Sequence, residues 1–84
     1  MVYYLILCRS LTYAQRTARI LERSGINCHI MRTPKKIAVE GCGYCVKIAE
    51  NRIARALTLL KQNELPPKQI YIHSKNDAFD EVEL

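Results

Sequence analysis

The spacing of apolar residues along the chain predicts four β-strands. VYYLILC, at residues 2–8, is apolar on both faces and rich in aromatic and branched side chains, which is typical of a central strand. INCHIMR (26–32) and YCVKIA (44–49) alternate between two faces, as strands do. KQIYIHS (68–74) supplies the last strand. These four segments are expected to form one sheet.

Two stretches between the strands have helical periodicity. Residues 10–25 form an amphipathic pattern, with a capping box predicted from Thr12 and Gln15 and a stop at Gly25. The slim contact face of this helix consists of Ala14, Ala18 and Leu21. Residues 51–64 place apolar side chains at positions i, i+3, i+4 and i+7 and predict a second helix.

The order of the predicted elements is βαββαβ. Right-handed crossovers then place both helices on one face of a four-stranded antiparallel sheet, an α+β fold of the ferredoxin-like kind. The first and third strands are expected in the middle of this sheet. The loop that carries Cys42 would open into a central strand, so we expect function at that end of the sheet.

Charge is distributed unevenly along the 84 residues. Residues 1–75, which we expect to form a single domain, contain 13 basic and four acidic side chains, a net charge of +9. Residues 76–84 contain four acidic side chains and no basic one, and we expect an acidic C-terminal tail that is frayed. A basic body suits an anionic partner or an anionic reaction centre.

Whether the four cysteines form disulfides depends on the cellular compartment of the protein. The opening apolar run is too short to span a bilayer and has no basic residue before it, which favours the cytoplasm over secretion or a membrane. Thiols stay reduced in the cytoplasm. Reactive, metal-binding or buried cysteines are therefore expected, and not a disulfide framework.

Cys42 lies in the stretch GCGYC between Gly41 and Gly43. Two flanking glycines let the backbone take a positive φ and approach a bound group, and successive N–H groups in such a turn can bind an anion. Nearby cations can lower the pKa of a thiol, and the candidates are Lys35, Lys36 and Lys47. Cys42 is therefore a candidate nucleophile, although a small residue in a tight loop explains the same pattern.

The other three cysteines have weaker signals. Cys45 completes a C-x-x-C spacing, but Cα atoms three residues apart in an extended chain are about 10 Å apart, too far for a disulfide. We expect Cys45 on the outward face unless a turn at Gly43 brings it closer. Cys8 and Cys28 are expected to fill the core. The cysteine spacings match no zinc pattern, so we predict no metal site.

The sequence resembles the selenium/sulfur carrier-like family of small prokaryotic proteins from about residue 2 to residue 60. The residues that match are Ser10, Ala14, Leu21, Gly25-Ile26, Pro34-Lys35-Lys36-Ile37 and Cys42-Gly43. Two positions depart from the family pattern. Cys45 stands where a small residue is expected, and Cys8 stands where an aromatic residue is more usual.

The resemblance implies a carrier, an accessory protein and not a stand-alone enzyme. Cys42 would accept sulfur or selenium, as a persulfide or selenenyl sulfide, from a donor such as a cysteine desulfurase. It would then pass the atom to an acceptor protein, and no cofactor would be needed. Cys45 could resolve the loaded Cys42 by forming a disulfide.

Two alternatives remain open from the sequence. An RNA recognition motif has the same element order, but its third-strand signature fails here at Glu40 and at Cys42, and Tyr44 is expected to face the helices. Tyr3 or Tyr4 would be its first-strand platform. A dimerising regulatory module is the other alternative, because the doubly apolar first strand needs a second cover, from another subunit or from the tail.

Overall fold

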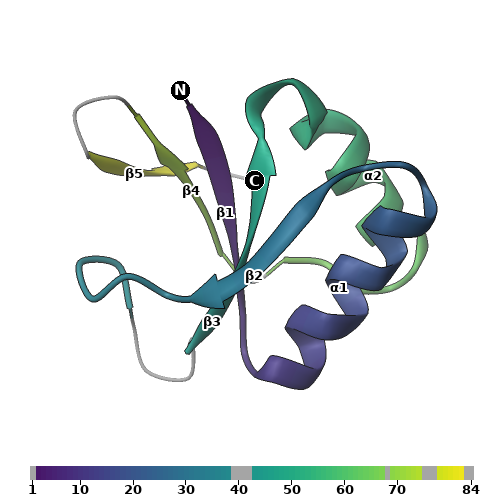
Figure 1. The fold of residues 1–84 in the computed structure, drawn as a ribbon, viewed down its shortest axis with the longest axis horizontal. Coiled ribbons are helices and arrows are strands. Elements are labelled where there is room, and N and C mark those ends of the chain that lie inside the picture. Colours follow the sequence, from purple (N-terminus) through teal and green to yellow (C-terminus); the bar gives the residue numbers. More distant parts are fainter. Residues whose placement is uncertain (1, 39–42, 68, 75–77, 83–84) are drawn as a thin grey trace.

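The computed structural model describes residues 2–38, 43–67, 69–74 and 78–82. It contains two helices and five strands (Figure 1). In chain order, the elements are β1 (Tyr3–Cys8), α1 (Leu11–Arg23), β2 (Cys28–Arg32), β3 (Tyr44–Ala49), the short 3-10 helix η1 (Glu50–Arg52), α2 (Ile53–Gln62), β4 (Gln69–His73) and β5 (Phe79–Val82). None of the helices in these described stretches is long and apolar enough to cross a membrane.

The strands form one antiparallel sheet in the order β2-β3-β1-β4-β5. The predicted four-stranded sheet was therefore wrong by one strand. Phe79–Val82, which the sequence placed in a frayed acidic tail, instead pairs with β4. The Gln69 amide also donates a hydrogen bond to the Glu81 carboxylate at 3.2 Å. The α+β class is confirmed, with β1 in the middle of the sheet and β3 beside it.

Capping residues set the ends of α1. The helix begins after Ser10, whose hydroxyl accepts the Tyr13 N–H at 3.3 Å, so the capping box predicted from Thr12 and Gln15 is wrong. The helix ends at Arg23, and Gly25 follows as the predicted stop with a φ of +81°. There the Ile26 N–H returns to the Leu21 carbonyl at 2.9 Å, the pattern of a Schellman motif.

The larger core lies between the sheet and the two helices, which cover the same face (Figure 1). Its buried members are Ile6, Cys8, Ala14, Leu21, Ile26, Val46, Ile48, Ala56, Leu60 and Ile70. Ala14 and Ala56 bring small side chains to this layer, which allows each helix to lie close to the sheet.

A second, smaller core lies on the opposite face of the sheet. Leu5, Leu7 and Cys45 project there from β1 and β3, and Ile37 covers them from the connection between β2 and β3. Phe79 of β5 packs against the same cluster. The chain itself therefore covers the second apolar face of β1. Part of that cover is Phe79, which lies in the predicted C-terminal tail.

We predict that Ile37→Ala destabilises the fold by about 2–4 kcal/mol, because it removes the cap of the smaller core and leaves a cavity. Ile30→Ala is the matched control, since Ile37 is 6% exposed and Ile30 is 37% exposed. We expect the control to cost about 1 kcal/mol or less. Urea unfolding of both variants measures the difference, and equal losses would show that Ile37 caps nothing.

Candidate functional site

The candidate site lies at the end of the sheet where β3 starts. The strand register brings the ends of β1 and β2 to this point. Tyr44, the first residue of β3, pairs with Cys8 at the end of β1 and with Arg32 at the end of β2. The Thr33 N–H donates to the Gly43 carbonyl at 3.1 Å, which closes the base of the connection between β2 and β3. The connection that carries the predicted site therefore leaves the edge strand β2 and enters β3, which lies beside the central strand β1.

Gly43 is the one residue of the GCG stretch that the structure describes, and it is exposed. Its φ is not in the left-handed region, and a Cβ atom built on it would meet nothing within 4 Å. The backbone therefore does not require glycine here. Gly41 and Cys42 lie outside the described residues, so their predicted roles stay predictions.

The three lysines that the sequence emphasised lie in two different places, on the connection after β2 and within β3. Lys35 and Lys36 are exposed on the turn closed by the Ile37 N–H and the Pro34 carbonyl, at 3.0 Å. Lys47 has a different neighbour, because its ammonium nitrogen lies 4.0 Å from the centre of the Tyr3 ring. Whether Lys47 acts on Cys42 stays a prediction.

Two arginines that sequence reasoning missed lie at the ends of β1 and β2, and each contacts a different tyrosine ring. Arg32 ends β2 with its guanidinium carbon 5.8 Å from the Tyr44 ring centre. Arg9 follows the last residue of β1, and its guanidinium carbon is 5.2 Å from the ring centre of Tyr13. The sequence does show a basic residue at or just after the end of β1 and of β2. Only the strand register shows that these two strand ends both lie beside the start of β3.

The three described cysteines lie in sheltered positions. Cys8 is buried in the larger core, as predicted, and Cys28 is half-buried with its sulfur 3.7 Å from the Ala18 carbonyl oxygen. Burial, with a contribution from the charge of Glu22, raises the pKa of Cys28 from 9.0 to about 11. Cys28 is therefore protonated at neutral pH.

Cys45 projects from the face opposite the helices, as predicted, but Ile37 covers that face and the thiol is fully buried. Burial raises its pKa from 9.0 to about 11, and the charge of Cys8 adds to the rise. The Thr33 hydroxyl lowers the pKa but does not offset the effect of burial, and its buried oxygen has no hydrogen bond of normal geometry to any described residue. A protonated, covered thiol is a poor nucleophile.

The structure also places the side chains that RNA binding or metal binding would use. Tyr44 packs against the larger core, so the third-strand aromatic of an RNA recognition motif is not on the open face of the sheet. Tyr3 does lie on that face, with its ring centre 5.4 Å from that of His73. Within the described stretches, no three His, Cys, Asp or Glu side chains gather where they could hold a metal ion.

Comparison with known protein families adds an independent observation. The model of the family described as "Putative Se/S carrier protein-like" matches residues 3–72, most of the chain. The chain belongs to this family. The match confirms the family resemblance that the sequence suggested. Neither a comparison with the curated proteins nor one with the solved structures found a match.

We predict that Cys45 makes the fold sensitive to alkali. In the unfolded chain its thiol ionises near pH 9.0, whereas in the folded protein it stays protonated to about pH 11. Ionisation in this window favours the unfolded chain, so stability is lost as the pH rises, by up to about 1.4 kcal/mol per pH unit. Urea unfolding across the window should show a shallower decline for Cys45→Ala than for the wild type. Parallel declines would contradict the burial of Cys45.

Proposed function

We propose that the protein is a carrier that holds sulfane sulfur or selenium on Cys42 and hands it to a partner protein. Family membership supports the carrier class. The observation that supports the choice of thiol is the sheltering of the other three. Cys8 and Cys45 are buried, Cys28 is half-buried, and the pKa values of Cys28 and Cys45 are raised to about 11.

Loading requires the ionised form of the carrier thiol. The Cys42 thiolate attacks the outer sulfur of a donor persulfide, the donor's S–S bond breaks, and the donor leaves as a thiolate while Cys42 becomes the persulfide. Unloading repeats the same exchange with an acceptor thiol. Each step exchanges one S–S bond for another, so no external oxidant or reductant is needed.

Features around the described part of the site support this chemistry. The exposed Lys35 and Lys36 place positive charge on the connection that leads to Cys42, which favours both a thiolate and an anionic persulfide. Gly43 is exposed, and the space where its Cβ would lie is open. A partner's active site could therefore approach the chain on the C-terminal side of Cys42 without displacing a side chain.

Cys45 has a narrower role in this proposal. If it resolved the loaded Cys42, a disulfide would form between the two and the outer sulfur would leave as hydrogen sulfide. The cover over Cys45 by Ile37 and its raised pKa both slow that reaction. We therefore propose that the cargo passes mainly to an acceptor protein, after loading by a donor of the cysteine desulfurase class in the reducing cytoplasm.

Loading by a cysteine desulfurase with cysteine tests the proposal. Peptide mass spectrometry under non-reducing conditions should find one or more added sulfur atoms on the peptide that contains Cys42. Cys42→Ser should abolish loading because it removes the nucleophile, whereas Cys28→Ser should load as the wild type does because Cys28 is protonated. Undiminished loading of Cys42→Ser would refute the assignment of Cys42.

A further inference from the structure

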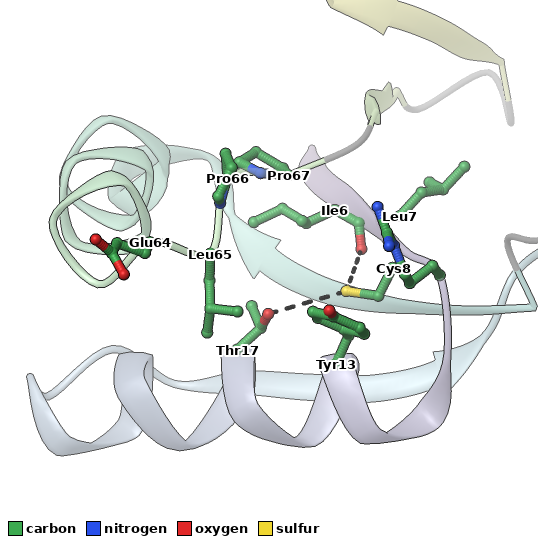
Figure 2. Close-up of a pocket in the computed structure, with 10 residues that line it drawn as sticks. Ile6, Leu7, Cys8, Tyr13, Thr17, Glu64, Leu65, Pro66 and Pro67 are labelled. Carbon is green, nitrogen blue, oxygen red and sulfur yellow. Dashed lines mark hydrogen bonds between the residues drawn. The ribbon is translucent and has the colours of Figure 1, made fainter.

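Two neighbouring pockets form a groove between α1 and the connection from α2 to β4. The first has a volume of about 370 Å³ and lies beside the end of β1 (Figure 2). Its lining includes Arg9, Tyr13, Leu65, Pro66 and Pro67. The second has a volume of about 340 Å³ and is lined by Arg16, Arg19, Ile20, Asn63, Glu64 and Leu65. Glu64 and Leu65 line both pockets, so the two meet at these residues.

Two arginines give the second pocket a positive charge. Arg16 and Arg19 lie three positions apart on α1, so their side chains extend from the same side of the helix. Both are exposed, and neither forms an ion pair with any residue that the structure describes. The pocket has one carboxylate, that of Glu64, which leaves one positive charge uncompensated. Guanidinium groups bind phosphate oxygens through paired hydrogen bonds, so this pocket suits a phosphate group.

Glu64 occupies a position where glycine is the usual residue. It follows Asn63 at the end of α2 with a φ of 58°, a left-handed conformation that residues with a Cβ atom rarely adopt. The Leu65 N–H returns to the Leu60 carbonyl at 2.9 Å and completes a Schellman motif, which fixes this conformation. A side chain at such a position, where glycine would be unstrained, indicates a use for the carboxylate. Its oxygens accept hydrogen bonds, and hydroxyl groups of a ligand would supply them.

The first pocket offers a flat surface. Tyr13 is 38% exposed, and the guanidinium carbon of Arg9 lies 5.2 Å from the centre of its ring. Tyrosine rings and guanidinium planes are both groups on which nucleobases stack. Pro67 lines the same pocket from the connection after α2, where its ring restricts the backbone. Figure 2 shows the Glu64 carboxylate on the side of Leu65 away from Tyr13, so this acidic group does not lie at the stacking surface.

We propose that the groove binds a ribonucleoside monophosphate. The phosphate lies between Arg16 and Arg19, the ribose hydroxyls face Glu64, and the base stacks beside Tyr13. The order of these groups along the groove is the order of phosphate, ribose and base in a nucleotide. Pockets of this size hold a small molecule, which favours a single nucleotide over a longer chain. The proposal does not depend on the cargo of Cys42.

NMR titration of the reduced protein with AMP, adenosine and inorganic phosphate tests the proposal. AMP should shift the amide signals of α1 and of the turn after α2. It should bind about tenfold or more tighter than adenosine or phosphate alone, because the contacts to its parts act together. Binding of AMP no tighter than that of inorganic phosphate would overturn the proposal. So would tighter binding of a hexaadenylate without a terminal phosphate, since that result would indicate an RNA-binding surface.

Paired variants assign the phosphate contact to the second pocket. Arg16→Gln should lower the affinity for AMP about fivefold or more, because it removes a charged phosphate contact, and should leave the affinity for adenosine unchanged. Arg55→Gln makes the same change of net charge on the exposed surface of α2, outside both pockets, and should bind AMP as the wild type does. Unchanged AMP affinity in Arg16→Gln, or an equal loss in Arg55→Gln, would contradict the assignment.

Glu64→Gly tests the ribose contact. Glycine adopts the left-handed conformation without strain, so this variant should fold, and urea unfolding checks that it does. The wild type should bind AMP about threefold or more tighter than deoxyadenosine monophosphate, because the missing hydroxyl leaves the carboxylate without a partner. The variant should bind the two nucleotides equally. No preference in the wild type, or the same preference in the variant, would refute the role of Glu64.

Discussion

The structure depends on a central strand whose side chains are buried on both faces. Leu5, Ile6, Leu7 and Cys8 follow one another along β1, and all four are buried. Because successive side chains in a strand point to opposite faces, this run needs a hydrophobic cover on each side of the sheet. The helices cover one side, and Ile37 and Phe79 cover part of the other.

The double cover decides where thiol chemistry can occur. A cysteine on either face of the middle strands is sealed, and this includes Cys45, which would be open to solvent if the face opposite the helices were bare. The pKa values follow from the same burial, because a thiolate is costly in a desolvated site. Gly43, immediately before β3, lies outside this cover and is exposed.

Much of the fold follows from local patterns, but two features do not. The periodicity located both helices and four strands, and Gly25 ended α1 as predicted. The strand β5 was missed because Phe79–Val82 carries two acids in four residues, and the pairing with β4 that stabilises it lies outside the segment. The cap of Ile37 was missed because Ile37 lies in the connection after β2, outside any strand or helix pattern, and covers Leu5 and Leu7 from a distant part of the sequence.

The site was predictable only in part, for the same reason. The glycines, lysines and cysteines of the candidate site could be read directly from the chain. The pairing of both strand ends, Cys8 and Arg32, with Tyr44 depends on strand register, which short alternating segments do not specify. The pocket beside Cys8 likewise needs the turn after α2 to lie against the end of β1.

Site-resolved alkylation across a pH series is the most direct test of the central claim that the fold separates one reactive thiol from three sheltered ones. Limited iodoacetamide treatment, read by peptide mass spectrometry, gives a rate for each cysteine at each pH. We expect Cys42 to react fastest at neutral pH, and Cys28 and Cys45 to stay slow until the pH nears about 11. Faster alkylation of Cys45 than of Cys42 in the folded protein would contradict the account.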